Sequence, residues 1–302
     1  MTEEEVQVSR AYAINPKVNG MPLPFPKQLT RNVWMLGHHS DKSFGAIPYL
    51  VKGKYGDDGQ VISVMVDVPK FTKSAIRAVE ELVESTSGEG PDYMFLTHVD
   101  DTAQHNEWRE HFPNMKRIIH AGDLGEYNWL GDETLNDVEI ILKEESNVED
   151  MKLSIMTLNG RSHKEINCSN DSGVIGDTIS AAFQEFASDF IILHTPGHSP
   201  GSIALLHKPN GGTIFTGDTY AYSTRDGGRM TGFPRYGNNL SRQRMTLECI
   251  KSLSSQYACV ACGHGHPRNY IEIEKDGALE RSMNDLKELD VEDAMLDLRA
   301  YK

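Results

Sequence analysis

Short apolar runs separated by turn residues dominate the first part of the chain. Apolar residues gather at 33–36, 47–51 and 61–68, and each run has the length of a buried strand. The last two are joined by 55–60, where Gly56-Asp57-Asp58-Gly59 is typical of a hairpin turn. The proline-rich residues 1–31 precede them, and there we expect an extended N-terminal arm rather than packed elements.

Helical and strand patterns then alternate. Ile76, Val79 and Val83 form one apolar stripe, which predicts a helix. Apolar runs at 93–96 and 117–120 predict two strands with a further helix between them. Strand, helix and strand at this spacing indicate the α/β class, with layers of helices on sheets.

The second part of the chain is less regular. Residues 121–187 are acidic and weakly periodic, and we interpret them as an insertion at one edge of the domain that could cover a site. Strand patterns resume at 190–193. We therefore expect the main domain to continue past the insertion and to span 32–270. Spaced apolar residues in 271–302 predict an amphipathic helical tail, which could pack on its own domain or on a second copy in a homodimer.

Charge and composition narrow the class of partner. Acidic residues outnumber basic ones 44 to 30, for a net charge of −14, so a nucleic acid is not the expected partner. No apolar run approaches the roughly 18 to 20 residues of a membrane span, so no membrane partner is expected. The 4 cysteines are too few for a disulfide framework. We expect a cytoplasmic protein, or one in an organelle stroma if a presequence has been removed.

Histidine and aspartate residues follow four of the predicted strands. They lie in the segments Thr97-His98-Val99-Asp100-Asp101-Thr102-Ala103-Gln104-His105, Thr195-Pro196-Gly197-His198, Thr216-Gly217-Asp218-Thr219 and Gly263-His264-Gly265-His266. Imidazole and carboxylate are the usual zinc ligands, and they also suit iron and manganese. A sheet that fixes such ligands at strand ends leaves its loops free to shape an open coordination position.

In order and spacing these segments resemble the motifs of the metallo-β-lactamase superfamily, which includes the glyoxalase II enzymes and persulfide dioxygenases. His198, Asp218 and His264 match the last three motifs, and the motifs together cover about 32–268. The resemblance implies an αββα sandwich of the metallo-β-lactamase fold, with the metal site at one edge of the sheets.

The first motif departs from the family pattern His-x-His-x-Asp-His. Aligned without a gap, His98 and Asp100 take the histidine positions, and Thr102-Ala103 falls on the Asp-His pair. A gapped alignment puts Gln104-His105 on that pair and restores His105 as a ligand, although the aspartate is still missing. A divergent branch of the superfamily in photosynthetic organisms has a similar loop that ends in Asp-His, which favours the gapped alignment.

The candidate metal ligands are His98, Asp100, His105, His198, Asp218 and His264. We expect one divalent ion per chain at His98, Asp100 and His198, with Asp218 beside them. Zinc is the expected ion, and iron and manganese are alternatives. A second ion would depend on His105, His264 and a shared Asp218. Two of these residues have alternative interpretations: Asp100 could cap a helix, and His264 could donate a hydrogen bond without binding the metal.

The loss of the motif aspartate also bears on mechanism, because in family hydrolases it helps to hold the attacking water. Asp101 could take over this role, and Asp101 and His264 are the catalytic candidates. The predicted function is a metal-dependent hydrolase of a small acyl-type ester, thioester or amide, with a metal-bound water at a mononuclear site. The alternatives are a mononuclear iron oxygenase resembling persulfide dioxygenases and a non-catalytic binding protein of the same fold.

Cys259-Val260-Ala261-Cys262 has the spacing of a redox or zinc motif, but it lies in a predicted strand. Residues three apart on a strand point to opposite faces, so the two sulfurs are not expected to meet on one ion. We therefore interpret both cysteines as core residues.

Overall fold

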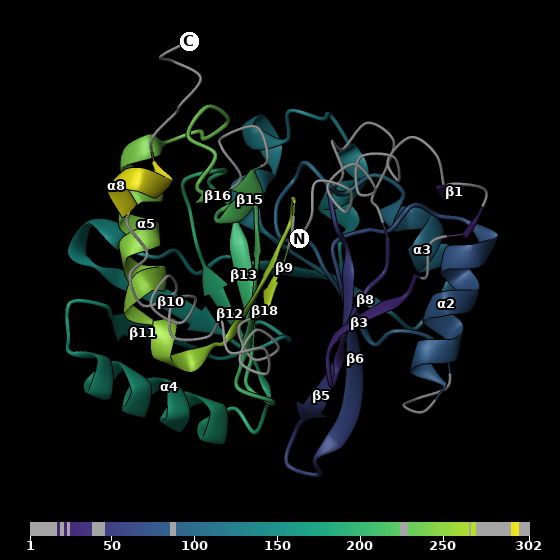
Figure 1. Ribbon diagram of the computed structural model, residues 1–302, viewed down its shortest axis with the longest axis horizontal. Coiled ribbons are helices and arrows are strands. Elements are labelled where there is room, and N and C mark those ends of the chain that lie inside the picture. The colour runs from purple at the N-terminus through teal and green to yellow at the C-terminus, as the bar shows by residue number, and fades with distance from the viewer. Residues whose placement is uncertain are drawn as a thin grey trace.

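Two seven-stranded sheets packed face to face form the body of the molecule (Figure 1). The computed structural model describes residues 17–18, 21–22, 25–37, 46–84, 89–223, 229–265, 267–269 and 291–295. Helices cover the outer face of each sheet, with α2 and α3 on one side of the sandwich and α4, α5 and α8 on the other. The α/β class and the αββα sandwich predicted from the sequence are confirmed.

The first sheet has the order β3-β4-β5-β6-β7-β8-β9. Its strands are β3 (Lys27–Thr30), β4 (Val33–Met35), β5 (Tyr49–Tyr55), β6 (Gln60–Val66), β7 (Tyr93–Phe95), β8 (Lys116–His120) and β9 (Ile140–Leu142). The pairs from β3 to β6 are antiparallel, and β5 and β6 form the predicted hairpin. From β6 to β9 the strands are parallel, so the loops that follow β6, β7 and β8 meet at one edge of the sheet.

Helices α2 (Lys73–Val83) and α3 (His105–His111) pack on the outer face of this sheet. The N-cap of α2 is Thr72, whose Oγ1 accepts a hydrogen bond from the Ala75 amide at 3.2 Å. The apolar stripe predicted for α2 buries Val79 and Val83. Trp108 of α3 is fully buried in the same layer.

The second sheet has the order β11-β10-β12-β13-β14-β17-β18. Its strands are β10 (Lys152–Met156), β11 (His163–Asn167), β12 (Phe190–His194), β13 (Ile203–His207), β14 (Thr213–Gly217), β17 (Cys259–Cys262) and β18 (Arg268–Asn269). Helices α4 (Ser172–Glu185), α5 (Leu240–Ser252) and α8 (Val291–Ala294) bury apolar side chains against its outer face. A small ribbon, β15 (Ala221–Ser223) and β16 (Arg229–Thr231), lies beside it.

The space between the sheets is filled by apolar side chains from both. The rings of Tyr49 and Phe215 meet edge to face with centroids 5.4 Å apart. Cys259 packs in this inner layer, whereas Cys262 packs under the helices on the outer face. The two cysteines therefore point to opposite faces of β17, which confirms the interpretation of both as core residues.

Residues outside the predicted regular elements are also part of the sheets. The segment 121–187, interpreted from the sequence as an insertion, contributes β9, β10, β11 and α4. The predicted N-terminal arm contains β3, which pairs with β4, and the short strands β1 (Lys17–Val18) and β2 (Met21–Pro22). Most of the predicted C-terminal tail lies outside the described residues, and its described part contains α8. None of the helices in the described ranges has the length and apolar character needed to cross a bilayer.

Candidate metal centre

The candidate ligands come together where strands of both sheets end. His98, Asp100 and Asp101 lie in the loop after β7 of the first sheet. The second sheet supplies His198 after β12, and its strands β14 and β17 are followed by Asp218 and His264. The site therefore joins the two halves of the sandwich.

One group consists of two imidazoles and a carboxylate. His98, His198 and Asp218 each offer one ligand atom, and these atoms all lie within 4.8 Å of one another. The Nε2 atoms of His98 and His198 are each 3.8 Å from Asp218 Oδ2. Asp100 Oδ2 adjoins them at 3.6 Å from His98 Nε2 and 3.5 Å from His198 Nε2. Two ligands of a tetrahedral zinc lie about 3.4 Å apart, which is close to these spacings.

A second group shares Asp218 with the first. Ligand atoms of Asp101, Asp218 and His264 lie within 4.8 Å of one another, and His264 Nε2 is 3.1 Å from Asp218 Oδ2. The sequence made Asp101 a catalytic candidate and His264 both a catalytic and a metal candidate. The structure places both beside Asp218.

Several atoms of these groups are buried without a hydrogen bond. Within the described ranges, His98 Nε2, His198 Nε2, Asp101 Oδ2 and Asp218 Oδ1 have no hydrogen-bond partner. A buried polar atom without a partner is costly, so such atoms in one cluster need an explanation. Ligation of a divalent cation would satisfy them, and the donor set of imidazole and carboxylate fits zinc, iron or manganese.

The charged side chains of the second group shift one another's pKa values. Burial raises the pKa of Asp101 to about 7, and the nearby carboxylate of Asp218 adds to the shift. Burial lowers the pKa of His264, but the attraction of Asp218 is stronger and brings that pKa to about 9. The cluster thus favours positive charge between its carboxylates, as a cation site should.

Asp67 and Thr97, which the sequence analysis missed, set the orientation of His98. Thr97 Oγ1 donates to Asp67 Oδ1 at 2.9 Å and lies 3.0 Å from His98 Nδ1. Because this hydroxyl proton is given to Asp67, the hydroxyl accepts from His98 Nδ1–H and leaves Nε2 with a free lone pair. An acidic residue directly after the buried strand β6 was the signal that could have identified Asp67.

Asp123 joins the two loops that carry the candidate ligands His98 and His198. It is fully buried, and its Oδ2 accepts hydrogen bonds from the Val99 amide and from Ser199 Oγ, each at 2.9 Å. Its Oδ1 accepts from the Gly201 amide at 2.6 Å. The residue lies in the segment 121–187, whose sequence shows no pattern that points to the site.

His105 is not part of the cluster, which corrects the prediction from the gapped alignment. It is buried in the first turn of α3, where its Nδ1 lies 2.8 Å from Arg117 Nη1. Its Nε2 lies 3.2 Å from Asp132 Oδ2 and 3.1 Å from Thr134 Oγ1. Both ring nitrogens are therefore occupied by protein partners, and Asp101 takes the place beside Asp218 and His264 that was expected for His105.

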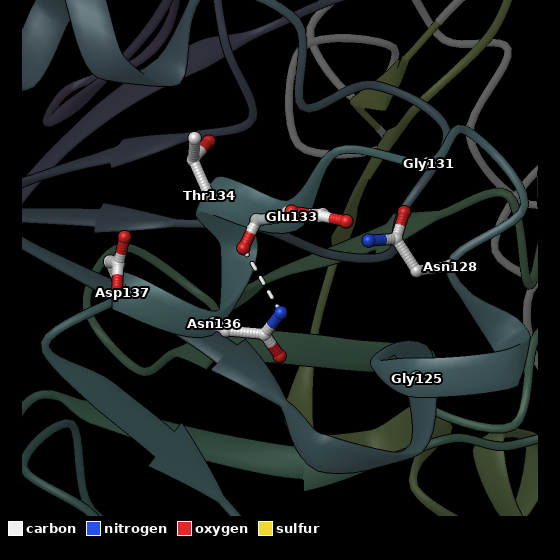
Figure 2. Close-up of a pocket in the computed structure, with 7 residues that line it drawn as sticks. All are labelled: Gly125, Asn128, Gly131, Glu133, Thr134, Asn136 and Asp137. Atoms are coloured by element: carbon white, nitrogen blue, oxygen red, sulfur yellow. Dashed lines mark hydrogen bonds between the residues drawn. The ribbon is translucent and has the colours of Figure 1, made fainter.

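His105 and its partners Arg117, Asp132 and Thr134 form what we call the His105 network. An open polar pocket lies next to this network, over the chain segment that follows β8. Figure 2 shows its lining residues, which are Gly125, Asn128, Gly131, Glu133, Thr134, Asn136 and Asp137. None of the candidate ligands lines it. The pocket is therefore distinct from the metal cluster, although Thr134 belongs to both the pocket and the His105 network.

Comparisons with known proteins support the architecture. No family model matches the chain, and no curated protein sequence matches it. The structure is similar to a metallo-β-lactamase from Erythrobacter litoralis, with a TM-score of 0.50, 14% identity, and coverage of 85% of this chain and 95% of that one. The metallo-β-lactamase DIM-1 aligns at a TM-score of 0.49 with 11% identity, over 85% of this chain and 96% of that one. A metallo-β-lactamase from Hirschia baltica aligns at a TM-score of 0.48 with 15% identity, over 83% of this chain and 94% of that one.

Proposed function

We propose that this chain, which has the metallo-β-lactamase fold, is a metal-dependent hydrolase of a small acyl-type substrate such as an ester, thioester or amide. One observation carries the proposal. The buried Nε2 atoms of His98 and His198 face the carboxylate of Asp218 across ligand-sized distances, and in the described residues neither nitrogen has a hydrogen-bond partner.

We assign the first ion, with zinc as the expected metal, to His98, His198 and Asp218, with Asp100 as a fourth ligand. When bound there, a divalent ion supplies polarisation of a carbonyl oxygen and acidification of water. Asp101 Oδ2 is buried and without a hydrogen bond to the described residues, so it can accept a proton from an attacking water. His264 holds a proton beside Asp218 that can be given to a leaving group.

The second group, made of Asp101, Asp218 and His264, favours hydrolysis over single-iron oxygen chemistry. A carboxylate shared between adjacent metal positions is typical of sites that clamp the attacking and leaving oxygens of a hydrolytic reaction. We propose that this position binds a second, weaker ion when metal is in excess. At low metal concentration this position is free of metal, so Asp101 can accept a proton and His264 can donate one.

The function is tested by loading the protein separately with zinc, manganese and ferrous iron and assaying a panel of esters, thioesters and amides. We expect zinc-dependent turnover that His198→Ala abolishes and that Asp101→Asn lowers in kcat by roughly 10²- to 10⁴-fold. Absence of turnover with every ion would reject the hydrolase. Oxygen consumption with thiol or persulfide substrates by the iron form alone would support the oxygenase instead.

A further inference from the structure

Trp129 and Leu130 stand at the tip of a tight turn that follows β8. The turn is closed by a hydrogen bond of 2.9 Å from the Gly131 amide to the Asn128 carbonyl. Gly131 has a φ of +68°, in the left-handed region that glycine adopts without strain. The two residues at the tip are 48% and 51% exposed, so the turn presents two adjacent large apolar side chains to solvent.

The indole of Trp129 makes a specific contact with a candidate ligand. Its Nε1 donates a hydrogen bond of 2.6 Å to Asp100 Oδ1. The other oxygen of the same carboxylate, Oδ2, faces the Nε2 atoms of His98 and His198. The two oxygens thus have separate roles, since one faces the metal position and the other is held by the indole. Hydrogen bonds of this kind orient a metal-ligating carboxylate.

The His105 network fixes the position of the turn through hydrogen bonds. Asn128 Nδ2 donates to the Asp132 carbonyl at 2.7 Å, and the side chains of Asp132 and Thr134 contact His105 Nε2. His105 in turn is fixed by the buried Arg117 of β8. The position of the indole is therefore set by packed elements, which explains a buried histidine near the site that does not ligate.

We propose that Trp129 positions Asp100 for the metal and that its exposed indole forms an apolar wall beside the metal position that binds an aromatic or branched acyl group. A ligand seated against this wall removes exposed apolar surface from water and can stack on the indole face. The substrate class rests on the proposed function, whereas the positioning of Asp100 does not.

The positioning role is tested by zinc affinity, measured in competition with a chromophoric chelator. Trp129→Phe removes the N–H donor but keeps an aromatic ring, and we expect affinity to fall by roughly 10- to 100-fold. Trp34→Phe is the matched control, since Trp34 lies on β4 with the Lys52 ammonium 5.3 Å from its ring centroid. Unchanged affinity in Trp129→Phe, or an equal loss in both variants, would overturn the positioning role.

The apolar wall is tested by binding of acetate and phenylacetate to the zinc-loaded protein, measured by calorimetry. We expect tighter binding of phenylacetate, a preference kept by Trp129→Phe and lost in Trp129→Ala. In the metal-free form both variants should melt near the wild-type temperature, because the indole is half-exposed. Equal binding of the two acids to the wild type would overturn the wall. If these results hold but no ester or thioester is hydrolysed, the proposed function fails while the Trp129 assignment stands.

Discussion

Individual carboxylates decide how the histidines of the cluster face one another. Asp67 acts through Thr97 on the ring of His98, and Asp123 ties the loops that carry His98 and His198. The candidate ligands could be proposed from the sequence because they follow strands in a family-like order. These supporting carboxylates could not, because their partners lie far away in the chain.

We predict that Asp123→Asn weakens both folding and metal binding. An amide nitrogen would replace one of the oxygens that accept from Val99, Ser199 and Gly201 and would face a donor. The expected loss in the free energy of unfolding is roughly 2 to 4 kcal/mol. Urea denaturation and zinc titration measure the two effects, with the exposed Asp177→Asn as control. Equal behaviour of the two variants would refute the role of Asp123.

We predict an acid-sensitive stability that depends on His194. This buried ring stacks on His120 with centroids 4.0 Å apart, and burial, with His120 and Arg242 nearby, lowers its pKa to about 3. The unfolded chain, with a histidine pKa near 6.5, takes up the proton first, so stability is present above pH 6.5 and is lost as the pH falls. The expected loss between pH 7 and pH 5 is roughly 2 kcal/mol.

The contribution of His194 to this pH-dependent loss of stability is isolated by comparing His194→Gln with the exposed His163→Gln. Each variant is unfolded in urea at both pH values. The pH-dependent loss should shrink only in His194→Gln. A loss that is the same in both variants would assign the acid sensitivity to other groups.

At the scale of elements, the strands and the loops after them follow from the sequence, whereas the start of α3 does not. Gln104 adopts a left-handed φ of 69° and α3 begins at His105, which turns this ring toward Arg117 and away from the cluster. A sequence alignment does not show the direction in which such a turn points a side chain. Within 121–187, β11 was missed for another reason: it is a polar edge strand with a single buried residue, so it carries no apolar pattern.

The turn that carries His198 depends on close packing against α5. Gly197 has a φ of +141°, and a Cβ there would lie 2.3 Å from Gln243 Cα, so we expect Gly197→Ala to displace the turn. We predict a loss of about 3 kcal/mol or more in the free energy of unfolding, with loss of zinc binding. Gly59→Ala is the control, because Gly59 has a φ of +65° but open space around it. A similar cost in both would mean that backbone strain, not the contact with α5, sets the effect.

At the scale of the whole molecule, each sheet supplies part of the candidate metal centre. His98, Asp100 and Asp101 come from the first sheet, and the second sheet supplies the remaining candidate ligands. The sandwich could be predicted from the order of the motifs, but the pairing of Asp101 with Asp218 and His264 appears only when the two sheets pack together. An ion bound here therefore links the two halves of the fold.

Removal of the metal should accordingly lower the thermal stability of the whole chain. At a zinc concentration about 100 times Kd, binding adds about 2.7 kcal/mol to the free energy of unfolding. We expect a chelator to lower Tm by several degrees and zinc to restore it, as followed by calorimetry. The His198→Ala variant should show no response, and an unchanged wild-type Tm would argue against a site that spans both sheets.

The central claim is that His98, His198 and Asp218 hold a divalent ion, and metal content per chain tests it most directly. Elemental analysis of the zinc-loaded wild type, His198→Ala, His264→Ala and His105→Ala should give one tight equivalent that is lost only with His198. The weaker second equivalent should be lost with His264, and His105→Ala should keep both when zinc is in excess, with the tight one bound less strongly because the turn that carries Trp129 loosens. Retention of the tight equivalent in His198→Ala, or its loss in His105→Ala, would contradict the account.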